Sequence, residues 1–210
     1  MIETTGIALA TFFATIGPLD VAAIFAALTT NSDAAHRRSM AIRGTLIGSA
    51  ILLLFAFVGE VLLTSFGISL AAFRTAGGIL LLLIGIDMVF ARSSGGTSTT
   101  DEEEREAASK EDISAFPIGM PLIAGPGAMS ATILLMSNTE GDLLLKAIVI
   151  GSLLVILLVT FISMLLAGQI QKALGITGMH VIARIFGVLL CALAVQFIFD
   201  GIQRSGLIGS

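Results

Sequence analysis

The stretch TIGPLDVAA (residues 15–23) places a Gly-Pro pair and an aspartate inside a long apolar run. The stretch LIAGPGAMS (residues 122–130) repeats the Gly-Pro pair in a second apolar run. Proline removes a backbone donor and clashes with the carbonyl one turn back, and glycine permits backbone angles that other residues avoid. Both stretches therefore predict an interrupted helix, with non-helical backbone at residues 16–20 and 124–128.

The composition indicates that a lipid bilayer surrounds most of the chain. Of its 210 residues, 56% are hydrophobic and 12% are charged, and the mean hydropathy is +1.02. Soluble domains carry about 25% charged residues, and a soluble core of this size could not cover so much apolar surface. No basic patch favours a nucleic-acid partner, and no catalytic triad, phosphate loop or group of metal ligands stands out. We therefore expect a membrane protein that is not an enzyme and holds no metal.

Six apolar segments reach the length of about 20 residues that a spanning helix needs. They cover residues 5–30, 42–64, 69–91, 116–138, 143–167 and 179–203. Because exposed backbone groups have no partner in hydrocarbon, these segments are predicted to be helices. A polar, acid-rich segment at residues 92–115 is predicted to be a cytoplasmic loop between two halves, residues 1–91 and 116–210.

The two halves resemble each other in the order of their motifs. The shared features are IGS at 47–49 and 150–152, the pairs Gly17-Pro18 and Gly125-Pro126, and an arginine three residues before a glycine at Arg74 and at Arg184. Because each half has three helices, an odd number, the second half must enter the membrane from the opposite side. The fold class predicted is an all-α membrane protein of six transmembrane helices, arranged as two inverted three-helix repeats with the first and fourth helices broken at the midplane.

Lysine and arginine are concentrated in the loops after the first, third and fifth segments. The positive-inside rule then places these loops in the cytoplasm and both termini outside it. Arg74 and Arg184 lie just over a turn inside the ends of their helices. We expect them to extend to the interface as anchors; a pair or gate between the repeats is the alternative.

The interruptions predict a small polar chamber at the bilayer midplane. Freed backbone groups must meet protein, water or a ligand. Pro18 and Pro126 suit the first turn of the second half-helices, whose N-termini carry partial positive charge and favour a carboxylate. The candidate substrate-binding residues are Gly17, Pro18, Asp20, Gly125, Pro126, Gly127, Ala128 and Ser130.

Two acids in the spans, Asp20 and Glu60, are candidates for coupling transport to an ion. Asp20 has three interpretations: it caps the half-helix, it binds a substrate ammonium or a coupling cation, or it carries a proton. Glu60 lies near the outer end of the second helix, where an interfacial acid or a proton-coupling group is expected. The expected ion is Na⁺ or H⁺.

Two segments resemble a known family. FPIGMPLIAGPGAMSATILL (residues 116–135) resembles the fourth-helix signature of the MarC family of six-helix bacterial inner-membrane proteins. FFATIGPLDVAAIFAALT (residues 12–29) resembles the family's first helix. The chain departs from that pattern at Gly17, Asp20 and Ala23, where the family has a polar residue, a glycine and a proline.

The resemblance implies a fold akin to the wider LysE-like transporter group, located in the bacterial inner membrane. It also implies a secondary transporter, exporting or ion-coupled, of small neutral amino acids such as alanine or glycine. Its partners would be a small zwitterionic substrate and the lipid bilayer, and the oligomeric state stays open. The alternative is a membrane scaffold or stress-response protein that transports nothing.

Overall fold

The structure, a computed structural model, describes residues 1–29, 32–90 and 112–206, and every regular element in these ranges is helical. The elements are α1 (Ile2–Ile16), α2 (Pro18–Leu28), α3 (Ala34–Ser65), α4 (Leu70–Phe90), the π-helical η1 (Ser114–Ile123), α6 (Pro126–Ser137), α7 (Leu143–Leu165) and α8 (Ala167–Arg204). Five helices are long and apolar enough to cross a membrane, or six crossings if η1 and α6 count as one. The prediction of an all-helical membrane protein is confirmed. Most of the predicted loop at 92–115 lies outside the described residues.

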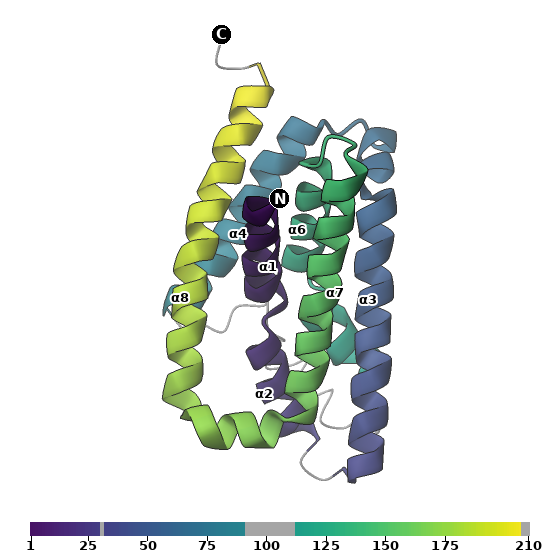
Figure 1. The fold of residues 1–210 in the computed structure, drawn as a ribbon, viewed down its shortest axis with the longest axis vertical. Helices are drawn as coiled ribbons and strands as arrows, with labels where there is room; N and C mark the ends of the chain where they lie inside the picture. The colour runs from purple at the N-terminus through teal and green to yellow at the C-terminus, as the bar shows by residue number, and fades with distance from the viewer. Residues whose placement is uncertain (30–31, 91–111, 207–210) are drawn as a thin grey trace.

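The helices run alternately up and down along one long axis, and the start of α1 and the end of α8 lie towards the same end of the bundle (Figure 1). The first turns of α8 cross the opposite end before the helix turns back along the bundle. Residues 167–178, which the sequence analysis leaves outside or at the edge of its spans, are therefore helical. This stretch begins AGQIQKAL, in which the alanines, glutamines, lysine and leucine are good helix formers.

Helices pack mainly against helices of the other half, where the halves are the elements before and after residues 91–111. α3 packs against η1 and α6, and α7 packs against α1 and α2. α4 and α8 form the most extensive pair. Helices of the same half make far fewer contacts with one another, so the described core is built almost entirely between the halves.

Glycines bring the paired backbones close together. A Cβ on Gly48 of α3 would lie 2.8 Å from the Cβ of Ile123 in η1. A Cβ on Gly85 of α4 would lie 2.7 Å from the Sγ of Cys191 in α8. Neither position has room for a larger side chain, which is typical of helix packing in membranes, where small residues let backbones approach.

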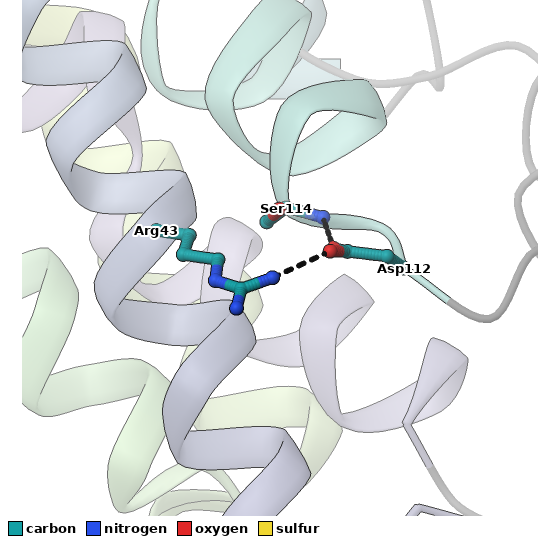
Figure 2. Close-up of polar contacts among 3 residues, drawn as sticks. All are labelled: Arg43, Asp112 and Ser114. Atoms are coloured by element: carbon teal, nitrogen blue, oxygen red, sulfur yellow. Dashed lines mark hydrogen bonds and ion pairs between the residues drawn. The ribbon is translucent and has the colours of Figure 1, made fainter.

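A polar cluster ties the start of η1 to α3 (Figure 2). Arg43 donates from NH1 to Oδ2 of Asp112 at 3.1 Å, and the Ser114 N–H donates to Oδ1 of Asp112 at 2.9 Å. Hydrogen bonds from the side chain and backbone of Ser114, helped by Arg43, hold the pKa of Asp112 below its usual range. The carboxylate therefore stays ionised near neutral pH and fixes where the second half begins.

Candidate functional site

The first interruption is a single residue, Gly17. It has left-handed angles, φ 61° and ψ 63°, and its N–H donates to the Phe13 carbonyl. Helix α2 starts at Pro18, and the Gly17 carbonyl accepts from the Val21 N–H at 2.9 Å. The predicted non-helical stretch of 16–20 is therefore too long, because proline at the first helical position restarts the helix at once.

Asp20 lies in the first turn of α2 and is half-buried. Its Oδ2 lies 3.0 Å from the position that a Cβ on Gly17 would occupy, so the carboxylate folds back over the interruption. The first N–H groups of a helix have no acceptors in its preceding turn. The Asp20 carboxylate at this place interacts favourably with the partial positive charge of the helix start. This position is the one that the capping interpretation requires.

The second interruption is wider. Ala124 has φ −99° and ψ 59°, and Gly125 is extended, with φ −76° and ψ 166°. Helix α6 starts at Pro126, and its axis is bent by 51° from that of η1. Residues 126–128 are helical, so the predicted stretch of 124–128 is again too long at its C-terminal side.

The irregular backbone extends further upstream than the sequence analysis predicts. Phe116 and Met120, inside η1, have extended angles with φ −136° and −145°. Each precedes a proline, Pro117 or Pro121, in a cis peptide bond. A residue before proline is pushed away from helical angles, so the two prolines are the signal that could have revealed this.

The residues of the second interruption differ in exposure. Gly125, Gly127, Ala128 and Ser130 are buried, whereas Pro126 is exposed. A Cβ on Gly127 would meet Cδ1 of Ile84 in α4, so the end of the Ile84 side chain would have to shift. The second interruption is therefore packed directly against α4.

The structure brings the two interrupted spans into contact, because α1 packs on α6 and α2 packs on η1. Each of the contacting helices α1 and α6 carries a hydroxyl without a hydrogen-bond partner among the described residues, on Thr11 and on Ser130. Thr11 is fully buried, and Ser130 is 7% exposed. By contrast, the Thr132 hydroxyl donates to the Ala128 carbonyl of its own helix at 2.7 Å.

Glu60 lies apart from the interruptions. It lines a cavity of about 90 Å³ with residues of α3, α6 and α7, and no residue of either interruption lines this cavity. The same cavity is lined by Lys146 and Ser137, which the sequence analysis does not single out. Glu60, Ser137 and Lys146 share a cavity because α3, α6 and α7 are neighbours. Local sequence patterns do not indicate which helices are neighbours.

Arg74 does not extend to the interface, and its predicted role as an anchor is wrong. Its side chain is 1% exposed, and its three guanidinium nitrogens have no hydrogen-bond partner among the described residues. The charged groups that act on it electrostatically include Arg204, Asp200 and Glu140. Its helix, α4, packs on both α8 and α6. Arg184, by contrast, is exposed.

Interrupted apolar helices that pack across two halves define the chain as a multi-pass integral membrane protein. The model of the MarC family of integral membrane proteins matches residues 3–205. The chain belongs to the MarC family, which confirms the predicted resemblance.

Its relatives come from archaea and bacteria. A UPF0056 membrane protein of Methanocaldococcus jannaschii is 36% identical over 200 residues, covering 94% of this chain and 95% of the relative. The UPF0056 membrane protein YvbG of Bacillus subtilis is 34% identical over 91% of this chain and 90% of its own. The UPF0056 membrane protein YhcE of Escherichia coli is 33% identical over 91% of this chain and 88% of its own. No solved structure matches.

Proposed function

We propose that the protein is a secondary transporter of small neutral amino acids such as alanine or glycine. One observation carries the proposal: two spans, one from each half, pack together, and each is interrupted by a Gly-Pro pair that restarts a helix. Helix starts present unpaired N–H groups and partial positive charge. In a membrane such groups need a partner, and a substrate carboxylate is one.

The proposed pose follows from the groups at the two helix starts. The carboxylate lies at the start of α6, where the N–H groups of Gly127 and Ala128 have no acceptor inside the helix. The unpartnered Ser130 hydroxyl adds a donor beside it. The substrate ammonium points towards α2 and Asp20, which also serves as the candidate group for Na⁺ or H⁺ coupling.

The inverted repeat belongs to the same proposal. The contacts support it because they are reciprocal: α3 packs on the first span of the second half, and α7 packs on the first span of the first half. An inverted repeat would place both interruptions near the midplane and let access alternate as the halves exchange environments. Charge in the loops supports termini outside the cytoplasm, in the inner membrane of a bacterial cell.

A second candidate is a membrane scaffold or stress-response protein without a substrate. It is favoured by the burial of most residues at the interruptions, with Gly127 packed on Ile84. A transporter in an occluded state has the same property, so flux must distinguish the two.

The test is uptake and counterflow in proteoliposomes with labelled alanine, glycine and serine, under imposed Na⁺ or H⁺ gradients. We expect Ser130→Ala to lower uptake by about fivefold to a hundredfold, since one polar partner lost in a buried site costs about 1–3 kcal/mol. Thr132→Ala is the matched control, because its hydroxyl is bonded within its own helix. It should transport like the wild type.

Asp20→Asn tests the coupling arm of the proposal. If Asp20 couples transport to an ion, the variant loses its response to the imposed gradient while counterflow continues. If gradient-driven uptake by Asp20→Asn equals that of the wild type, Asp20 does not couple transport to an ion and only caps the helix. If the wild type shows no flux of any of the three amino acids under either gradient, the scaffold function replaces the transporter.

A further inference from the structure

A second polar site lies away from the interruptions, in the cavity of about 90 Å³ that Glu60 lines. We call it the Glu60 pocket; its lining is Phe55, Ala56, Phe57, Glu60, Ile133, Met136, Ser137 and Lys146. Glu60 lies near the end of α3 and Lys146 near the start of α7. Figure 1 shows the end of α3 and the start of α7 at the end of the bundle where α8 ends.

The pocket contains one acid and one base that do not pair with each other. Neither the Glu60 carboxylate nor the Lys146 ammonium makes an ion pair or a side-chain hydrogen bond among the described residues. Elsewhere at this end of the bundle, Arg204 and Glu140 pair directly, with NH2 and Oε1 at 3.1 Å. The Glu60 pocket therefore offers a negative and a positive group that are both free to meet a ligand.

Ser137 gives the pocket a defined polarity. It is buried, and its hydroxyl donates to the Leu134 carbonyl at 2.8 Å. A hydroxyl has one proton and two lone pairs, so the oxygen of Ser137 can only accept from a ligand. Glu60 is also an acceptor and Lys146 a donor, so a ligand must bring an ammonium to one side and a carboxylate to the other.

We infer that the Glu60 pocket binds a small zwitterion of the amino-acid type. The ligand ammonium donates to Glu60 and to the Ser137 oxygen, and its carboxylate accepts from Lys146. One water needs about 10–15 Å³ of such space, so the cavity of about 90 Å³ holds a molecule of several heavy atoms. The apolar lining of Phe55 and Met136 suits a small aliphatic side chain.

The pocket also lies on the same face of α6 as the proposed transport site. Ser130 and Ser137 are seven residues apart, about 10 Å along a helix at 1.5 Å per residue, and this spacing puts them on one face. Ile133 lies between them, lines the pocket, and packs against Gly59. The pocket would hold substrate before it reaches the transport site, and this role rests on the proposed function. The binding of a zwitterion in the pocket does not depend on that function.

The test measures equilibrium binding of labelled alanine and glycine to the full-length protein in nanodiscs of phosphatidylglycerol, which has no ammonium in its headgroup. We expect Glu60→Gln and Lys146→Gln each to remove one bound ligand per chain, and the double variant to remove no more. Glu140→Gln and Arg204→Gln are matched controls, because they neutralise an acid and a base at the same end but outside the pocket. Both controls should bind as the wild type does.

Competitors test the two charges of the ligand separately. Propionate lacks the ammonium and ethylamine lacks the carboxylate, so neither should displace alanine from the pocket at tenfold excess. If Glu60→Gln and Lys146→Gln bind as much alanine and glycine as the wild type, the inference is wrong. It is also wrong if the wild type binds neither amino acid but retains phosphatidylethanolamine in a Glu60-dependent way, which would make the pocket a lipid-headgroup site.

Failure of the proposed function gives a different result. Suppose that the protein binds one alanine per chain in a Glu60-dependent manner but shows no flux in proteoliposomes. This result would support zwitterion binding in the Glu60 pocket and contradict the proposed transport function. Flux that persists at saturating alanine in Glu60→Gln, with a half-saturating concentration at least tenfold higher, supports both.

Discussion

Gly17 is the residue on which the first interruption depends, because its φ of 61° is one that side chains with a Cβ avoid. Gly17→Ala should lower the free energy of unfolding by about 1–2 kcal/mol, the cost of left-handed backbone for an L-residue. The new Cβ would also press on the Asp20 carboxylate, 3.0 Å away. Melting of the purified protein in detergent measures the change.

Gly6→Ala is the matched control for this prediction. Gly6 is a helical residue of α1, and no atom lies within 4 Å of the place where its Cβ would stand. Alanine should stabilise a helical position by about 0.5–1 kcal/mol relative to glycine. Equal effects of the two substitutions would show that Gly17 is not held in a left-handed conformation.

Single residues divide into those that the sequence reveals and those that only the packing reveals. The conformations at Gly17-Pro18 and Gly125-Pro126 depend on the residue types at those positions, so they can be predicted from the sequence. The predicted ranges of both interruptions were nevertheless too long. The burial of Arg74 and the shared pocket of Glu60 and Lys146 depend on which helices are neighbours. No spacing within one segment contains that information.

Whole helices follow the same division. The apolar lengths predicted the spans, but Pro117 and Pro121 were not recognised as the cause of an irregular η1. The first turns of α8 lie outside the apolar run of residues 179–203 and were therefore not predicted as helix. Hydropathy detects the apolar part of a helix, and a helix that continues beyond its apolar run needs the propensity of its residues as well.

The tripeptide IGS, which occurs in both α3 and α7, gives a matched test of helix packing. Gly48 of α3 faces η1, whereas no atom lies within 4 Å of a Cβ placed on Gly151 of α7. Gly48→Ala should lower the free energy of unfolding by about 1–3 kcal/mol, because Ile123 must move. Gly151→Ala should leave it unchanged or slightly higher. The melting temperature in detergent measures both, and a stable Gly48→Ala would mean that α3 and η1 are not in close contact.

The reciprocal packing of the halves makes a prediction for the whole chain. A protease site inserted between residues 100 and 101, within the polar segment of the sequence, should be cut without separating the halves. Their interface holds nearly all of the described helix contacts, so the two fragments should elute together in size-exclusion chromatography in detergent.

Expression of each half alone is the complementary experiment. Residues 1–91 or 112–210 by themselves leave the faces of α3, α4, α7 or α8 without their partners, so neither fragment should accumulate as a monodisperse species. Co-expression should restore both. A stable fragment of residues 1–91 made alone would contradict a core built between the halves.

The enclosed guanidinium of Arg74 makes membrane voltage part of the energetics of this protein. Moving one elementary charge through a full potential of 100 mV is worth about 2.3 kcal/mol. Arg74 lies within an apolar helix and has no ion-pair partner among the described residues. Any rearrangement that displaces α4 along the membrane normal therefore carries this charge through part of the electric field, and its rate must depend on the polarisation of the cell.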